Sequence, residues 1–183
     1  MIVVVIPAKG ISNRLPNKNM VTINGRPMMN YAVDQALESC LADAVYVSTD
    51  SDVIEKHCSN FAVEVIRRPM SLGGETPLLE VYRHATKLID KEGTLEILVG
   101  LQPDHPDRNV TVDETIEILR REQADRLISQ EENGTKNGAH YLLTKHYIDT
   151  GVSRKDVVIV DSCTNVHYAM DLESAAKRLA EKS

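Results

Sequence analysis

Residues 2–6 constrain the fold more than any other segment, because Ile2-Val3-Val4-Val5-Ile6 is apolar at every position. A strand that is apolar on both faces is expected where both faces of a sheet are covered, the usual setting of a central parallel strand. This strand leads directly into a loop, residues 7–19, that carries cations and small hydrogen-bonding residues. Ligands of open α/β sheets bind beyond the carboxyl ends of the strands, so the loop lies where a ligand site is expected.

Apolar runs alternate with helical patterns along the whole chain. The sequence predicts strands at Ile2–Ile6, Ala44–Ser48, Ala62–Ile66, Glu96–Leu101, Arg126–Ser129, Ala139–Leu143 and Val157–Val160. It predicts helices at Met28–Cys40, Asp52–Ser59, Pro77–Asp90, Val112–Glu122 and Leu172–Lys182. Strands that alternate with helices indicate an α/β fold with a mostly parallel central sheet. The 183 residues fit a single domain with a sizeable core, residues 1–183.

Local signals mark several boundaries. Pro77 suits the first position of a helix, and Thr111 with Glu114 has the spacing of a capping box. The least regular segment contains two Asn-Gly dipeptides, at 133–134 and 137–138, and both are turn signals. This segment is too short to separate two domains.

The charge distribution narrows the class of partner. Lys9, Arg14, Lys18 and Arg26 precede the first acid, Asp34, whereas the whole chain has a net charge of -6. A basic loop on an acidic protein favours a small polyanion such as a triphosphate over a nucleic acid or an anionic membrane. Aromatic residues make up only 4% of the chain, which argues against binding of single strands by base stacking. We therefore expect neither nucleic acid nor membrane as a partner.

The sequence is typical of a cytoplasmic protein. No apolar run approaches the roughly 20 residues that span a bilayer. The first residues lack the basic start and the small-residue cleavage site of a secretory signal. The cysteines are odd in number and widely spaced, which favours reduced thiols over a disulfide framework.

The loop after the first strand has residue types that bind phosphate: Lys9, Gly10, Ser12, Asn13, Arg14 and Lys18. Glycine lets backbone N–H groups approach a phosphate closely, and the small polar side chains donate hydrogen bonds. Arginine can hold a phosphate through two hydrogen bonds, while lysine acts as a point charge. The loop matches neither the Walker pattern nor Gly-x-Gly-x-x-Gly. These residues alone leave open a basic loop that is merely solvated.

The segment Ile6–Asn19 closely resembles the opening motif of the acylneuraminate cytidylyltransferases, which include the sialic acid synthetases and their keto-deoxy-octulosonate relatives. The family pattern is Ile-Pro-Ala-Arg-Gly followed by Ser-x-Arg-Leu-Pro-x-Lys-Asn, and only the early arginine is replaced, by Lys9. Further stretches similar to the family are Ile23–Met28, Val47–Ser51, Arg67–Pro69 and Asn137–Tyr141. The resemblance implies a three-layer Rossmann-like fold of the nucleotide-diphospho-sugar transferase type, and transfer of CMP from CTP to a sugar acid with release of pyrophosphate.

The resemblance also implies roles for individual residues. The backbone around Ala8 and the side chain of Asn19 would face the cytosine and the ribose. The triphosphate would be held by Lys9, Ser12, Arg14 and Lys18, and the three cations would neutralise charge on the leaving pyrophosphate. Arg68, or less favourably Arg67, would help to fix the nucleotide. Without the resemblance, this arginine pair is better explained as a solvated strand end.

A second segment follows the strand at 96–101 and is also aimed at the ligand crevice. It reads Gln102-Pro103-Asp104-His105-Pro106-Asp107-Arg108, and mixes the patterns of the sialic acid and octulosonate branches. By resemblance, Gln102 would contact the acceptor sugar and Asp104 would hold Mg²⁺, which suits a carboxylate. The alternative for Asp104 is a turn-forming aspartate. His105 and Asp107 depart from both branches and leave the acceptor open.

A third segment, Thr164–Glu173, departs from the family at its two usual metal-site acids, which here are Asn165 and His167. Asp171 matches a third acid but is better placed to cap the last helix. Cys163 with His167 does not make a zinc site, because no second pair of ligands lies nearby in the sequence. The loss of the two acids puts catalysis in doubt.

Family members carry a longer insert, used in part for dimerisation, where this chain has only residues 130–137. A family-type homodimer is therefore doubtful. Two alternatives to CMP transfer onto a sugar acid stay open: nucleotidyl transfer to another small anionic acceptor, and nucleotide binding without catalysis.

Overall fold

The computed structural model describes residues 1–74 and 76–182. The strands are β1 (Ile2–Pro7), β2 (Thr22–Ile23), β3 (Arg26–Pro27), β4 (Ala44–Thr49), β5 (Glu64–Arg67), β6 (Ile97–Leu101), β7 (Arg126–Gln130), β8 (Lys136–Thr144) and β9 (Asp156–Val160). The helices are α1 (Met28–Leu37), α2 (Asp52–Cys58), α3 (Leu78–Ile89), α4 (Val112–Arg121), α5 (Lys145–Thr150) and α6 (Ala169–Glu181). Two 3₁₀ helices lie at Lys18–Met20 and Met70–Leu72.

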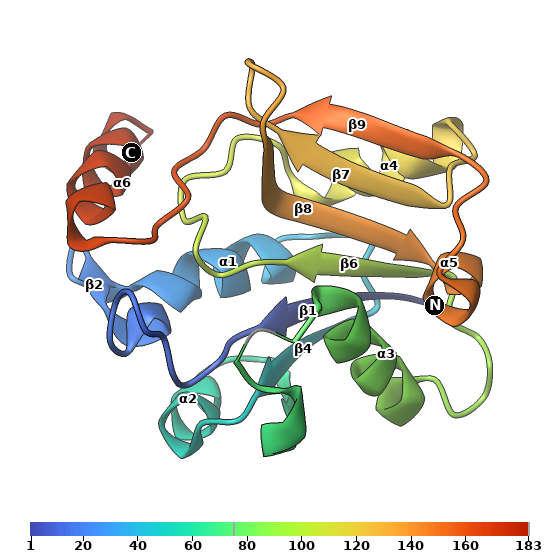
Figure 1. Cartoon of the computed structure of the whole chain (residues 1–183), viewed down its shortest axis with the longest axis horizontal. Coiled ribbons are helices and arrows are strands. Elements are labelled where there is room, and N and C mark those ends of the chain that lie inside the picture. The colour runs from blue at the N-terminus through green and yellow to red at the C-terminus, as the bar shows by residue number, and fades with distance from the viewer. Residues whose placement is uncertain (75, 183) are drawn as a thin grey trace.

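The main sheet has seven strands in the order β5-β4-β1-β6-β8-β7-β9 (Figure 1). Only β8 runs antiparallel to its neighbours. The first residues therefore form a central strand between β4 and β6, and all six residues of β1 are buried. The prediction of an α/β fold with a mostly parallel sheet is confirmed.

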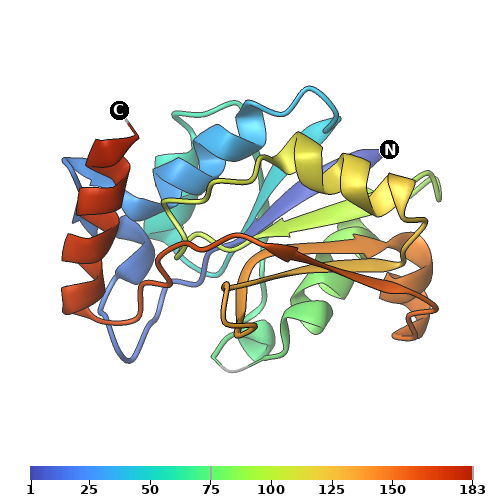
Figure 2. The same ribbon diagram turned by 90° about the horizontal axis from the view of Figure 1, so that it is seen from above.

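Helices cover both faces of this sheet, which makes three layers (Figure 2). On one face α1, α2 and α4 pack on the even-numbered residues of β1, including Val4 and Ile6. On the other face α3 and α5 pack on Val3 and Val5. Helix α6 lies at one end, where it packs against Ile23 and the start of α1 (Figures 1 and 2).

Each predicted strand and helix is present, with ends shifted by a few residues. The capping box is confirmed, because the Thr111 side chain accepts from the Glu114 N–H and the Glu114 carboxylate accepts from the Thr111 N–H. The sequence missed the β2–β3 pair and α5, and it started α3 one residue early, at Pro77.

One of the two predicted Asn-Gly turns is wrong. Residues 133–134 lie in the turn between β7 and β8, as expected, but Asn137 and Gly138 lie inside β8. Gly138 has a φ of 76°, a left-handed conformation that a strand tolerates only where glycine stands. The connection between β7 and β8 is residues 131–135, a short turn as the sequence indicated, and the absence of a family-type dimer stays a prediction.

None of the helices in the described part of the chain has both the length and the apolar character needed to cross a bilayer.

Tyr82 of α3 packs directly against Gly100 of β6. Tyr82 is fully buried in α3, and a Cβ added at Gly100 would overlap its hydroxyl and lie 3.0 Å from the Tyr141 carbonyl oxygen. We predict that Gly100→Ala lowers the free energy of unfolding by about 1–3 kcal/mol, the usual cost of overpacking. Urea denaturation measures this change.

Tyr82→Phe is the matched control. Its buried hydroxyl has no hydrogen-bond partner among the described residues, so its removal alone should be nearly neutral. Most of the cost of Gly100→Ala should remain in the Tyr82→Phe background, because the added Cβ would still overlap Cζ of the ring. A Gly100→Ala variant as stable as wild type would contradict the steric explanation.

Candidate functional site

A cavity of about 340 Å³ opens at the edge of the sheet where β1, β5 and β6 end. Strands β1 and β6 are neighbours, and the strand order reverses between them, because the next main-sheet strand after β1 (β4) and the next after β6 (β7) lie toward opposite edges of the sheet. Such a point is where α/β folds bind ligands. The predicted residues that line the cavity are Lys9, Ser12, Asn13, Arg14, Lys18, Asn19, Arg68, Gln102 and Asp104, together with His167. The structure therefore brings together residues up to 158 positions apart in the chain.

Ala8 and Gly10 do not line the cavity in the way that the sequence suggested. Ala8 is fully buried, and its N–H donates to the Ser48 carbonyl at 2.9 Å. The Gly10 N–H donates to Asp50 Oδ1 at 2.7 Å, so a carboxylate occupies the donor that we expected to meet a phosphate. A Cβ at Gly10 would lie 2.7 Å from Ser51 Cβ, so glycine allows the loop to pack against the start of α2.

Asn19 holds the loop closed from inside. Its side chain is buried, and its Nδ2 donates to the Lys9 carbonyl oxygen at 2.8 Å. The ends of the basic loop are thus fixed to each other, which presents Ser12, Asn13 and Arg14 on a short, tethered segment. Arg14 is exposed and has no hydrogen bond or ion pair to any residue that the structure describes.

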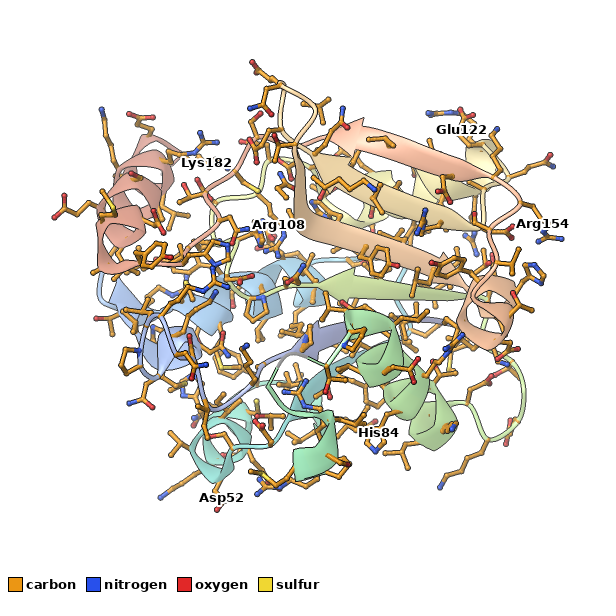
Figure 3. The ribbon with its side chains drawn as sticks, in the orientation of Figure 1. Asp52, His84, Arg108, Glu122, Arg154 and Lys182 are labelled. Carbon is orange, nitrogen blue, oxygen red and sulfur yellow. The ribbon has the colours of Figure 1, made fainter. Side chains whose placement is uncertain are left out.

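Arg68 and Arg67 point to opposite environments. The Arg67 guanidinium is half exposed and pairs with Asp52 and Glu55 of α2, and Asp52 lies at the outer margin of the molecule (Figure 3). The Arg68 side chain is only 4% exposed and lines the cavity. Alternation along β5 sends adjacent side chains to opposite faces, so only Arg68 can reach a ligand in the cavity.

The Arg68 guanidinium is a buried cation with few partners. Its nearest carboxylate is Asp50, with Nη2 3.8 Å from Oδ1, and Nε and Nη2 donate no hydrogen bond to the described residues. Burial lowers the pKa of Arg68, and Asp50 offsets this only in part. A buried charge without hydrogen bonds is costly, so the arrangement favours an anionic ligand that would supply them.

Lys18 and Asp104, predicted to bind phosphate and metal respectively, are joined to each other. Lys18 Nζ lies 2.6 Å from Asp104 Oδ2, and the two side chains are 12% and 14% exposed. His105 Nδ1 lies 3.1 Å from the other oxygen, Oδ1, without the alignment of a hydrogen bond. Burial alone would raise the pKa of Asp104, but His105 and Lys18 outweigh it and hold that pKa well below its usual range.

Gln102 is oriented by the start of the antiparallel strand. Its Nε2 donates to the Gly138 carbonyl oxygen at 2.8 Å, and a Cβ at Gly138 would overlap this side chain. The unusual glycine inside β8 therefore makes room for Gln102. The amide is held at the cavity wall, where the sequence predicted contact with an acceptor.

The segment before α6 runs beside Asp104. The Val166 N–H donates to the Asp104 carbonyl oxygen at 2.9 Å, which places His167 at the cavity wall. Burial, Lys18 and Arg14 lower the pKa of His167. Asp171 caps α6 by accepting from the N–H groups of His167 and Tyr168 at 2.8 and 2.7 Å, as predicted.

Asn165 does not line the cavity. Its Nδ2 lies 3.5 Å from the Asn137 carbonyl oxygen, and its buried Oδ1 accepts no hydrogen bond from the described residues. Across residues 1–74 and 76–182, no group of three or more His, Cys, Asp or Glu side chains is arranged to hold a metal ion.

Sequence reasoning missed the wall that faces the basic loop. Leu72, Gly73, Gly74 and Thr76 line the cavity from the segment between β5 and α3, and Lys9 Nζ lies 3.4 Å from the Gly74 carbonyl oxygen. The Gly73-Gly74 pair was the only available signal, and it indicates a turn without saying what the turn encloses.

Arg108 supports the cavity from behind. It is buried at the end of β6 beside β8 (Figure 3), and its guanidinium donates to the carbonyl oxygens of Gln102, His105 and Ala139. Burial lowers its pKa to about 10, so the group stays charged at neutral pH. These bonds fix the backbone that carries Gln102 and Asp104.

Comparison with known proteins decides the family. A model of the family described as Cytidylyltransferase matches residues 3–137, more than half of the chain. The chain belongs to the cytidylyltransferase family. It is 38% identical over 109 residues to 3-deoxy-manno-octulosonate cytidylyltransferase of Aeromonas salmonicida, which covers 57% of this chain and 40% of that protein. It is 37% identical over 70 residues to N-acylneuraminate cytidylyltransferase of Streptococcus agalactiae, 37% of this chain and 17% of that protein.

The cytidylyltransferase fold is equally clear from solved structures. The chain is similar to CMP:2-keto-3-deoxy-manno-octonic acid synthetase complexed with CTP, with a TM-score of 0.79, 15% identity, and coverage of 100% of this chain and 99% of that one. A cytidylyltransferase from Leptospira borgpetersenii gives 0.71 at 16% identity, covering 98% and 87%. The chain spans about 40% of the length of the Aeromonas relative that it matches.

Asp161, at the end of β9, anchors the segment that leads to His167. Its carboxylate is buried and accepts from His140 Nε2 at 2.9 Å and from the Asn109 N–H at 3.0 Å. Burial alone would raise the pKa of Asp161, but these hydrogen bonds outweigh it and leave the pKa well below its ordinary range. Burial also lowers the pKa of His140, which therefore donates as a neutral imidazole at pH 7.

Because the pKa of Asp161 is lower in the folded than in the unfolded chain, its stabilising effect is complete above about pH 5 and declines as the pH falls below about 4. We predict that Asp161→Asn lowers the free energy of unfolding by about 2 kcal/mol or more at pH 7 and by less at pH 4 and below. Urea denaturation across this pH range measures the difference.

Asp149→Asn is the control, because it removes an exposed partner of Lys145. It should lower the free energy of unfolding by about 0.5 kcal/mol or less throughout this pH range. A deficit of Asp161→Asn that grows toward low pH would contradict the assignment.

Proposed function

We propose that this protein transfers CMP from CTP to a hydroxyl of a sugar acid and releases pyrophosphate, with Mg²⁺ as cofactor, in the cytoplasm. One observation carries the proposal: Lys9, Arg14, Lys18 and Arg68 line one cavity at the carboxyl edge of the sheet, and Arg68 is buried there without hydrogen bonds from its Nε and Nη2 to described residues. A cluster of cations around a buried guanidinium suits a triphosphate. The family and the names of its relatives support cytidine as the nucleoside.

In the proposed reaction, the acceptor hydroxyl oxygen attacks the α-phosphorus while the bond from that phosphorus to the bridging oxygen of the β-phosphate breaks. Pyrophosphate leaves, and the hydroxyl proton passes to solvent. Such a transfer depends on positioning and on charge stabilisation. Arg14, Lys9 and Lys18 neutralise the pyrophosphate, Arg68 fixes the nucleotide, and Gln102 orients the acceptor from the wall beside β8.

Asp104 is the residue that fits Mg²⁺. It is a hard oxygen ligand at the cavity wall, its Oδ1 has no hydrogen bond to the described residues, and Mg²⁺ commonly uses one or two carboxylates with phosphates and water. When bound, the ion would neutralise charge on the phosphates. Asn165 and His167 stand where the family pattern has carboxylates, so Asp104 would be the main protein ligand.

Two sugar acids follow from the relatives: 3-deoxy-manno-octulosonate and an N-acylneuraminate. A second candidate function is nucleotide binding without transfer. It is favoured by Asn165 and His167, because neither replaces the charge of a carboxylate for Mg²⁺.

The first prediction for this site concerns nucleotide binding. CTP with Mg²⁺ should raise the melting temperature by about 5–10 °C at a hundredfold excess over Kd, and more than ATP or GTP does. Arg68→Met should weaken CTP binding about tenfold or more, because the buried guanidinium supplies charged hydrogen bonds. Differential scanning fluorimetry and calorimetry measure both effects.

Arg67→Met is the matched control, since the neighbouring side chain points away from the cavity and pairs with α2. It should leave CTP binding unchanged. Equal shifts for all nucleotides would refute the preference for CTP, and equal losses in the two arginine variants would refute binding at Arg68.

The second prediction separates transfer from binding alone. With CTP and Mg²⁺, pyrophosphate should be released steadily when 3-deoxy-manno-octulosonate or N-acetylneuraminate is added, and Arg14→Ala should reduce the rate about tenfold or more. A coupled phosphate assay measures the release. Tight binding of CTP with no release for either acid would instead support the non-catalytic function.

A further inference from the structure

Lys18 differs from the other cations of the cavity. Lys9 makes only a long contact with the Gly74 carbonyl, and Arg68 lacks hydrogen bonds at Nε and Nη2 within the described chain. Lys18 is instead neutralised, with Nζ 2.6 Å from Asp104 Oδ2 and both side chains largely buried. The residue expected to hold phosphate is thus engaged by the residue expected to hold the metal ion.

In this arrangement, Lys18 cannot hold phosphate and Asp104 cannot hold a metal ion while the two side chains are paired. The Lys18 ammonium lies 2.6 Å from Asp104 Oδ2, on the side from which a metal ion would approach that oxygen. A metal ion bound to the same oxygen would lie close to the ammonium, and two neighbouring cations repel strongly where water is scarce. His105 borders the other carboxylate oxygen, Oδ1, at 3.1 Å. A divalent ion can therefore reach Asp104 freely only after Lys18 has moved.

We propose that Lys18 serves as the cation of Asp104 in the nucleotide-free protein, and that the triphosphate draws Lys18 away and so opens Asp104 to the divalent ion. Nucleotide then binds before the protein-held metal ion. This order rests on the proposed function, because it requires phosphates in the cavity.

The backbone around Lys18 allows this exchange without a loop movement. Lys18 begins a 3₁₀ helix whose turns are closed by bonds from Met20 N–H to the Asn17 carbonyl at 2.7 Å and from Val21 N–H to the Lys18 carbonyl at 3.3 Å. Asn19 ties this helix to the Lys9 carbonyl. Only the flexible four-carbon stem of Lys18 has to turn from the carboxylate to the phosphates.

The decisive experiment titrates Mn²⁺ into the protein without nucleotide and follows free Mn²⁺ by electron paramagnetic resonance. Wild type should bind the ion weakly at Asp104, and Lys18→Met should bind it about tenfold or more tightly, because the competing charge is gone. Lys18→Gln is the second variant, in case Lys18→Met does not fold. Adding Asp104→Asn to either variant should abolish the gain in Mn²⁺ affinity.

Lys9→Met is the matched control, because it removes a cation from the same cavity that is not paired with Asp104. It should change Mn²⁺ affinity far less than Lys18→Met does. Equal gains in the two lysine variants, or no gain in either, overturn the proposal while leaving the nucleotide site intact.

A calorimetric titration of wild type with CTP in EDTA completes the test. We expect CTP to bind without any divalent ion. If CTP binds only once Mn²⁺ is present, the order is reversed and the proposal is wrong. If CTP binds under neither condition, the proposed function itself fails, and the Mn²⁺ titration still decides whether Lys18 shields Asp104.

Discussion

The complete burial of β1 determines where the chemistry of this protein lies. Because both faces of β1 pack against helices, the strand occupies the middle of the sheet, with β4 on one side and β6 on the other. Its parallel neighbours end at the same edge, so the loop after β1 meets Arg68 and the segment from Gln102 to Asp104 there. Each cavity residue is thus placed by a strand or by a segment tied to one.

The cavity contains partly buried cationic side chains, and not all of them are paired with an acid among the residues that the structure describes. The fold determines which hydrogen-bond acceptors each of them can reach. Arg108 donates to three backbone carbonyls and to Gln35 Oε1, which makes it a support for the cavity. Arg68 lacks such acceptors at Nε and Nη2 in the described chain. The two buried arginines therefore differ in their surroundings: Arg108 has a structural role, and Arg68 is available to a ligand.

Much of this arrangement could be predicted from local patterns. The uniform apolarity of residues 2–6, the alternation of strands and helices, and the Thr111–Glu114 spacing depend on neighbours in sequence, and each was confirmed. What could not be predicted depended on distant partners. Gly10 meets Asp50 and Ser51 in place of a phosphate. Gly138, left-handed inside β8, lacks the Cβ that would overlap Gln102.

The reversed direction of β8 has a consequence for how proteins of this shape can diverge. Because β8 runs against its neighbours, its first residues lie at the edge where the parallel strands end, and the carbonyl oxygen of Gly138 there accepts from Gln102. The turn at 131–135 leads directly into these residues. Insertions in that turn would alter the wall of the cavity that Gln102 lines, while the loop that follows β1 stayed unchanged. Under the proposed function, such insertions would change the acceptor that the site takes without changing the nucleotide that it uses.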